Sequence, residues 1–201
     1  MSYSFQYEKL AQALYWALKE DAFYFAMEKA AGGNESARNK MFRYMDYSMV
    51  EAREYGELYL PSDHEHGVSI WSKPLARETE LKKSREKKDF LLEYMGEECL
   101  KTYVNIVDFM SEKAEPLIGD DFWYLSIVGI LPAFQGQGLG PGLINSVLKQ
   151  TDALNVPTFL ETFTPRNMSF YNRLGYEAVD SFFEPTAQCE YWVMVREPRT
   201  P

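Results

Sequence analysis

Four glycines at alternating positions constrain this chain more than any other feature of its sequence. Gly136, Gly138, Gly140 and Gly142 follow an apolar run at 122–131 and precede a helical pattern of apolar residues. Glycine inside regular structure costs roughly 0.5–1 kcal/mol relative to alanine. Several together are therefore expected where the main chain turns sharply or where a ligand approaches it closely. The segment predicts a strand, a tight loop and a helix in succession.

Two familiar nucleotide-binding patterns do not fit this loop. The pattern G-x-G-x-x-G requires glycine where the chain has Pro141 or Leu143, and the pattern G-x-x-x-x-G-K-[ST] requires Gly-Lys where it has Leu143-Ile144. A third interpretation is a seat for a pyrophosphate, in which N–H groups of the loop and of a helix beginning near Pro141 point at one anion. A tight turn that binds nothing remains the alternative.

The rest of the sequence predicts a layered α/β fold with a mixed sheet. Helices are expected over 7–29, 36–53 and 77–114, and a hairpin over 56–61 and 67–74. The continuous apolar runs at 122–131 and 156–163 predict strands buried on both faces. A short helix over 165–174 and strands over 176–184 and 190–197 complete the chain. The charged run at 77–90 is typical of a solvated helix face.

Composition limits the possible partners. The 201 residues carry a net charge of −9, which argues against nucleic acid as a partner. The acidity would suit a cationic small molecule, or it serves solubility alone. Cys99 and Cys189 form no short-spaced metal motif and no disulfide scaffold. No apolar run reaches the roughly 18 residues of a membrane span, and the start of the chain is unlike a signal peptide, so we expect a cytoplasmic protein without a membrane partner.

Two motifs resemble a known family. The stretch 135–140 matches Q/R-x-x-G-x-G/A, and 167–176 matches N-x-x-[FL]-Y-x-x-x-G-[FY]. At this separation they resemble the acetyl-CoA-binding motifs of the GNAT (Gcn5-related) N-acetyltransferases over about 122–196. The hairpin at 56–74 is similar to a subgroup that includes puromycin N-acetyltransferase-like proteins. The resemblance implies one GNAT domain over 1–201, with a splayed strand pair, an acceptor side at 1–120 and an acetyl-CoA-binding core at 121–197.

The resemblance also assigns residues to the acyl donor. The diphosphate of acetyl-CoA would lie on the loop residues Gln135, Gly136, Gln137, Gly138, Leu139, Gly140 and Pro141. The pantetheine arm and the acetyl group would meet backbone N–H groups of Val128, Gly129 and Ile130, where Gly129 suits a bulge in the strand. Asn167 and Tyr171 lie four residues apart on one helix face, so Asn167 can meet the pantetheine amide and Tyr171 can protonate the leaving thiolate.

The acceptor side is less determined. Glu161 is a candidate base acting through water, although it could equally be a structural partner or bind the acceptor's cation, and solvent could take the proton. His64 and His66 are further candidates in principle, but they are typical of a hairpin turn. The rings expected in the acceptor pocket are those of Tyr15, Trp16, Phe23, Tyr24, Phe25 and Trp71.

The expected activity is acetyl transfer to a primary amine of a small molecule, by a monomer or homodimer without a metal. A peptide acceptor and a non-catalytic acyl-CoA binder remain alternatives.

Overall fold

The computed structural model describes residues 3–199 and arranges them around one six-stranded sheet. The strands are β1 (Gly56–Tyr59), β2 (Gly67–Ser72), β3 (Trp123–Ile130), β4 (Thr158–Thr162), β5 (Glu177–Glu184) and β6 (Cys189–Arg196). The α-helices are α1 (Glu8–Leu18), α2 (Ala22–Ala30), α3 (Glu35–Tyr55), α4 (Arg77–Phe90), α5 (Glu97–Ala114), α6 (Leu139–Leu154) and α7 (Pro165–Leu174). A π-helical turn, η1 (Leu91–Met95), separates α4 from α5, and a 3₁₀ turn, η2 (Pro132–Phe134), precedes α6. Across residues 3–199 no helix combines the length and apolar character needed to cross a membrane.

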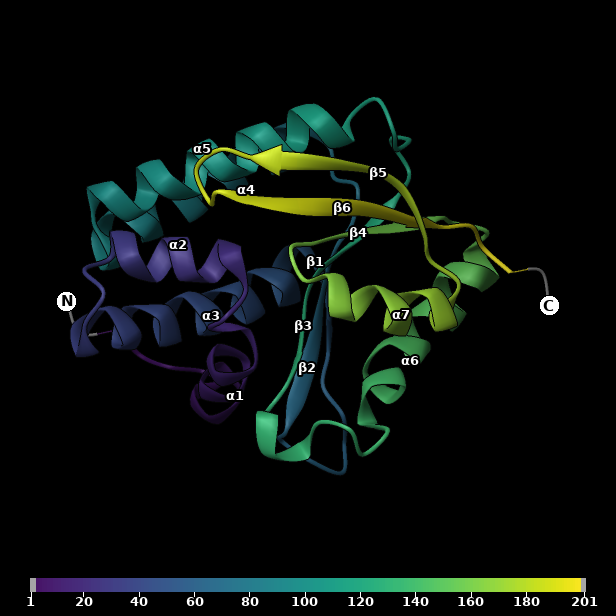
Figure 1. Ribbon diagram of the computed structural model, residues 1–201, viewed down its shortest axis with the longest axis horizontal. Helices are drawn as coiled ribbons and strands as arrows, with labels where there is room; N and C mark the ends of the chain where they lie inside the picture. The colour runs from purple at the N-terminus through teal and green to yellow at the C-terminus, as the bar shows by residue number, and fades with distance from the viewer. Residues whose placement is uncertain (1–2, 200–201) are drawn as a thin grey trace.

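The sheet opens in its middle. Its strands lie in the order β1-β2-β3-β4-β6-β5, and β3–β4 is its one parallel pair. These two strands pair only at Trp123–Thr158 and Tyr124–Phe159 before they separate. In Figure 1, β2 and β3 run down the view while β4, β6 and β5 run across it. The expected mixed sheet with a splayed strand pair and the expected β1–β2 hairpin are confirmed.

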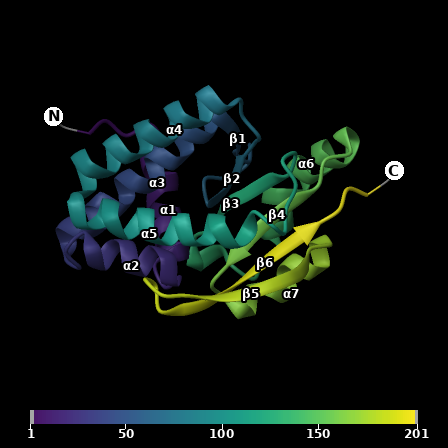
Figure 2. The same ribbon diagram turned by 90° about the horizontal axis from the view of Figure 1, so that it is seen from above.

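Helices cover both faces of this sheet. One apolar core joins α1, α2, α3 and η1 to β2 and β3, while a second joins α6 and α7 to the opposite face. A third, smaller core lies between α5 and the β5–β6 pair. Figure 2 shows α1–α5 gathered on one side of the molecule and α6 and α7 on the other. The core formed with α6 and α7 spans both halves of the sheet, whereas the core with α1–α3 contacts β2 and β3 and the core with α5 contacts β5 and β6.

The bulge of β3 lies at a different residue from the one predicted. The register with β2 jumps from Ile70–Ile127 to Trp71–Leu125, so Ser126 is the extra residue in β3. The predicted bulge at Gly129 is wrong, because Gly129 pairs regularly with Val68. Instead, Gly129 lets α1 approach the strand. A Cβ there would lie 2.9 Å from Leu14 Cδ2.

Two predicted helices are interrupted. The helix expected over 7–29 is two helices, because Asp21 caps α2 by accepting a hydrogen bond from the N–H of Phe23 at 3.1 Å. The helix expected over 77–114 is broken by the π-helical turn and by Gly96, whose φ of 97° is in the region that favours glycine. Helix α6 begins at Leu139, two residues before Pro141.

The expected burial of β3 on both faces is also wrong. Its residues alternate between buried and half-buried, beginning with the buried Trp123. The half-buried side chains of Tyr124, Ser126 and Val128 all line a cavity, and Val128, beyond the bulge, also packs against the core formed with α6 and α7. An aromatic and β-branched run can therefore border a ligand site as well as a core.

Replacing Gly129 with alanine tests the contact between α1 and β3. We expect G129A to destabilise the protein by about 1–3 kcal/mol, because the new methyl group would press on Leu14 and Ala17. Gly142→Ala in α6 is the matched control, because a Cβ there meets nothing within 4 Å. Urea unfolding of the two variants and the parent protein measures the difference. Equal stability of G129A and the parent protein would contradict the close approach.

Candidate active site

The glycine loop between β3 and α6 is an open cradle of main chain. Gly136 and Gly138 have φ values of 75° and 79°, which other residues adopt only with strain. A Cβ at either position would meet no heavy atom within 4 Å, so the loop is bare on its outer side. No side chain caps the N-terminus of α6 at Gly138. Gly140 favours glycine for a different reason: a Cβ there would lie 3.0 Å from the ring of Phe170 on α7.

Side chains around the loop fix its shape. The side-chain amide of Gln135 donates to the carbonyl of Ile130 at 2.9 Å, and that of Gln137 donates to Ala133 at 3.2 Å. The ring of His66 stacks on Phe134 at 3.5 Å between ring centroids, and His64 stacks on His66. The two histidines therefore brace the loop from the β1–β2 turn, and neither lines the cavity described next.

A cavity of about 440 Å³ fills the space where β3 and β4 separate. Its walls come from α2, α3, α4 and α5, from β2, β3 and β4, and from the first turns of α7. It reaches Val128, Asn167 and Tyr171 on the side nearest the loop, while none of the loop residues 135–141 lines it. The contact of Gly140 with Phe170 joins the start of α6 to the helix that carries Asn167 and Tyr171.

Three residues were predicted to contact the pantetheine arm, and only one of them lines the cavity. Val128 lines it, whereas Gly129 and Ile130 do not. Ser126, at the bulge, lines it and donates its hydroxyl proton to the carbonyl of Ile70 at 3.1 Å. Ser126 was not predicted, since a serine in an apolar run gives no distinctive signal for a bulge.

Asn167 and Tyr171 both line the cavity from one face of α7. Tyr171 is buried, and burial, aided by the nearby Asp21, raises the pKa of its phenol well above the usual value near 10. The phenol therefore stays protonated throughout the neutral range, as a proton donor must. Asp21 also accepts a hydrogen bond from Thr164 Oγ1 at 3.3 Å, which links the start of α2 to the start of α7.

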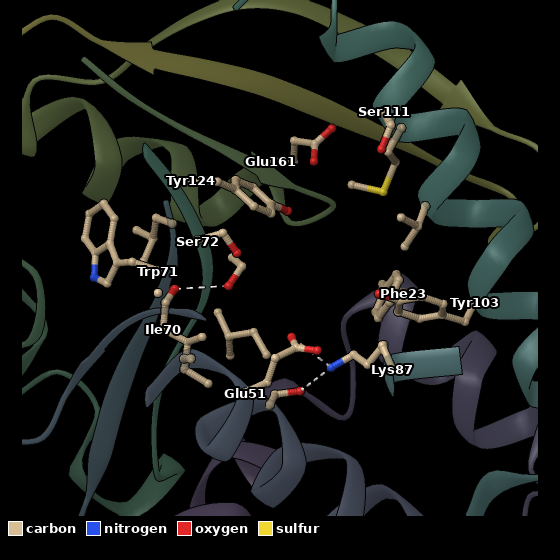
Figure 3. A pocket seen from close by; sticks show the side chains of 18 of the residues that line it. Phe23, Glu51, Ile70, Trp71, Ser72, Lys87, Tyr103, Ser111, Tyr124 and Glu161 are labelled. Carbon is tan, nitrogen blue, oxygen red and sulfur yellow. Dashed lines mark hydrogen bonds and ion pairs between the residues drawn. The ribbon is translucent and has the colours of Figure 1, made fainter. Parts of the chain in front are cut away.

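Glu161 faces the cavity from β4, beside the hydroxyl end of Tyr124 (Figure 3). Burial raises the pKa of its carboxyl to about 7, and the Tyr124 hydroxyl offsets part of this rise. Among residues 3–199, Glu161 Oε1 has no hydrogen-bond partner. A carboxyl group with this pKa exchanges protons readily near neutral pH, which is the property of a general base or acid.

Half of the predicted pocket rings line the cavity. Phe23, Tyr24 and Trp71 do so, whereas Tyr15, Trp16 and Phe25 do not. The ring of Phe25 is exposed, and the hydroxyl of the buried Tyr15 donates to Glu28 instead. These exceptions lie on the outer or core-facing sides of α1 and α2.

Further lining residues carry weaker signals in the sequence. They include Tyr44, Tyr103, Tyr124, Glu51 and Lys87. Lys87 contradicts the expectation of a solvated face for 77–90, because it is only 6% exposed. Its helical spacing from the buried Phe90 is the one signal that could have found it.

Within the part of the chain that the structure describes, no group of three or more His, Cys, Asp or Glu side chains is placed to hold a metal ion.

The raised pKa of Glu161 makes stability depend on pH in a defined direction. Between about pH 4.5 and 7 the folded chain binds more protons at this carboxyl than the unfolded chain, so stability falls as the pH rises through this window. Glu161→Gln removes this term. We expect E161Q to gain stability relative to the parent protein from pH 5 to pH 7 and to hold that gain at pH 8, measured by urea unfolding. A difference that does not change with pH would contradict the assignment.

Comparisons with known proteins agree with the fold and with the two sequence motifs. A model of the acetyltransferase (GNAT) family matches residues 69–176, from β2 to the end of the second motif. A solved structure of histone acetyltransferase HPA2 and related acetyltransferase from Corynebacterium glutamicum is similar with a TM-score of 0.66 at 18% identity, covering 98% of this chain and 93% of that one.

Two eukaryotic structures share the same fold. Arylalkylamine N-acetyltransferase 2 from Aedes aegypti matches with a TM-score of 0.62 at 14% identity, covering 96% of this chain and 94% of the other. Polyamine N-acetyltransferase from Drosophila melanogaster matches with a TM-score of 0.54 at 12% identity, covering 77% and 80%. At these identities the structural likeness describes the fold, whereas the family match spans more than half of the 201 residues. The chain belongs to the acetyltransferase (GNAT) family and is an acetyl-transferring enzyme.

Proposed function

We propose that this enzyme transfers the acetyl group of acetyl-CoA to a primary amine of a small molecule by direct attack. Tyr171 acts as the general acid and Glu161 as the general base. The observation that carries the proposal is a single cavity that has Asn167 and Tyr171 on one side and Glu161 where β3 and β4 separate. Acetyl-CoA supplies an activated thioester, and the residues below bind it and move protons.

The loop at 135–141 fits the diphosphate of the donor. Its glycines leave space on the outer side, and the uncapped N-terminus of α6 offers backbone N–H groups and the positive end of the helix dipole. Pro141 lacks an N–H and can only shape the start of the helix. Asn167, three residues before the Phe170 ring that contacts Gly140, is the proposed contact for the pantetheine amide.

The open edge of β3 is the proposed seat of the reacting carbonyl. Beyond Tyr124 the strand has no pairing with β4, so its backbone groups on that side can meet a ligand. Ser126 and Val128 take the place in this proposal that Gly129 and Ile130 held in the sequence analysis. A backbone donor aimed at charge that develops during acyl transfer is worth about 2.7–4 kcal/mol.

Two groups complete the proton transfers. Glu161, with a pKa of about 7, takes the proton that the acceptor's ammonium must lose before attack. Tyr171, which stays protonated, gives its proton to the departing thiolate. The carboxyl group of Glu161 enters the cavity from β4 and the phenol of Tyr171 from α7, and these elements follow one another along the chain.

A cavity of about 440 Å³ lined by rings favours a small acceptor over a peptide. Phe23, Tyr24, Tyr103 and Tyr124 line it, and α2–α5 form its walls. The net charge of −9 favours the approach of a cation. The names of the Aedes and Drosophila proteins, which describe amine acetyltransferases, agree with this acceptor class. A cytoplasmic location and the state as monomer or homodimer stay predictions from the sequence.

Tyr171→Phe separates an enzyme from a non-catalytic binder. We expect kcat for thiol release from acetyl-CoA with an amine acceptor to fall by about 100-fold or more, while calorimetry shows unchanged acetyl-CoA affinity. The matched control is Tyr176→Phe, whose hydroxyl bonds Thr158 at 2.9 Å and does not line the cavity. Unchanged turnover in Y171F would show that Tyr171 is not the general acid. Binding of acetyl-CoA without turnover on any amine would identify a binder.

The pH dependence of kcat/KM tests Glu161. We expect the rate to fall below about pH 7 as the carboxyl takes up its proton and can no longer act as a base. Glu161→Gln should lower the rate and abolish that inflection. A profile with the same inflection in E161Q would assign the proton transfer to solvent or to another group.

A further inference from the structure

A buried lysine forms the wall of the cavity opposite Glu161. Lys87 reaches from α4 toward α3, where its Nζ lies 3.4 Å from Glu51 Oε2 and donates to Ser48 Oγ at 3.2 Å. Figure 3 shows this pair below the cavity and Glu161 above it, with Tyr124 and Ser72 along one side. Of the lysines that line the cavity, Lys87 is the most buried, with 8% of its side chain exposed against 15% for Lys83 and 28% for Lys73.

The surroundings of Lys87 are those of a cation-binding site. Its ammonium lies 4.9 Å from the ring centroid of Tyr44 and 4.7 Å from that of Tyr47. Rings at this distance together with a carboxylate are the groups that bind ammonium ligands. Glu51 Oε1 has no hydrogen-bond partner among the described residues. We call Tyr44, Tyr47, Ser48 and Glu51 the α3 cage.

Of the other lysines that line the cavity, Lys88 is exposed, and Lys83 and Lys73 have partners outside the α3 cage. Lys83 lies 3.9 Å from Glu80, and Lys73 pairs with Glu57 and lies over the ring of Trp123. The carboxylate of Glu51 is thus balanced from within the chain by Lys87, whereas that of Glu161 has no cation paired with it in residues 3–199. Glu161 is therefore free to receive a ligand's ammonium, whereas Glu51 is already neutralised. Of the other carboxylates that line the cavity, Asp21 accepts hydrogen bonds from Phe23 and Thr164, Glu80 lies near Lys83, and Asp108 is exposed.

We propose that Lys87 fills a second cation site in the acceptor cavity and so restricts the acceptor to amines that carry a single positive charge. This inference rests on the proposed function, because it takes the acceptor's reacting amine to lie near Glu161. A second ammonium at the far end of the acceptor would enter the α3 cage beside Lys87, where Glu51 is already neutralised and the like charge of Lys87 opposes it. The acceptor class is a monoamine with an aromatic or aliphatic body and an uncharged far end.

The middle of the cavity agrees with this class. Tyr124 on one side and Phe23 and Tyr103 on the other flank the space between Glu161 and the Glu51–Lys87 pair, so rings can pack against the body of an amine (Figure 3). A ligand that spans this space meets a carboxylate at one end and a neutral ion pair at the other. Lys87 is a specificity-determining residue in this scheme and takes no part in the chemistry.

A matched pair of amines tests the inference. Hexylamine and cadaverine have the same length, and they differ in having a methyl or an ammonium group at the far end. We expect the parent enzyme to show a higher kcat/KM for hexylamine. Lys87→Met, which keeps the length of the side chain and removes its charge, should raise the cadaverine-to-hexylamine ratio by about tenfold or more, because Glu51 is then free to take the second ammonium.

The control is Lys82→Met on the same helix. Lys82 also lies over a ring, that of Tyr55, and pairs with Glu54 and Glu86, but its side chain is 58% exposed and does not line the cavity. K82M should leave the ratio unchanged. A parent enzyme that prefers cadaverine, or a folded K87M with an unchanged ratio, would overturn the inference.

Two additions keep the test decisive. If K87M does not fold because Glu51 is left buried without a cation, the double variant Lys87→Met, Glu51→Gln buries no unpaired charge. It removes the receiving carboxylate but frees the rings of Tyr44 and Tyr47 for the second ammonium, so it should still raise the ratio, by a smaller factor. Calorimetric titration with cadaverine tests the cage without turnover: K87M should bind it more tightly than the parent protein does, and equal affinity would overturn the inference. If neither amine is acetylated but this difference in affinity appears, the proposed function fails and the cation site remains.

Discussion

The structure depends on a sheet that stops being continuous after two residue pairs. Beyond Tyr124–Phe159 the strand β3 stays with β2 while β4 stays with β6, so a parallel pair becomes two separate edges. Unpaired strand edges inside a protein are unfavourable unless another partner takes up their polar groups. The helices close the gap from outside without filling it, and this leaves the cavity. The bulge at Ser126 bends β3 at the point of separation.

The two carboxylates at opposite walls of the cavity, those of Glu51 and Glu161, have different surroundings. Lys87 neutralises Glu51 at one wall, whereas Glu161 stands apart from any basic side chain in the described residues and has its pKa raised by burial. Elsewhere the buried Arg196 forms a bidentate ion pair with Asp152 and donates a hydrogen bond to the carbonyl of Leu174. These contacts hold β6, α6 and α7 together. Pairs of this kind are structural. The carboxyl of Glu161 has no such partner among the described residues.

Much of this architecture could be predicted from local patterns. The glycine loop predicted a strand, a loop and a helix in this order, and the helix is α6. The two motifs predicted the family. The bulge could not be placed, because it depends on how β2 and β3 pair, and the glycine expected to form it serves the packing of α1. The break between α1 and α2 depends on one capping side chain, Asp21, within a helical pattern. Lys87 was missed because a run rich in both charge signs hides one inward-facing residue.

The hydrogen bond between Thr164 and Asp21 has a mechanical consequence. It joins the residue just before α7 to the residue just before α2, although 143 positions separate them in the chain. One end of this link is at the start of α2, which forms part of the cavity wall, and the other is at the start of α7, which carries Tyr171. A displacement of the start of α2 would therefore be transmitted to the start of α7 through this hydrogen bond.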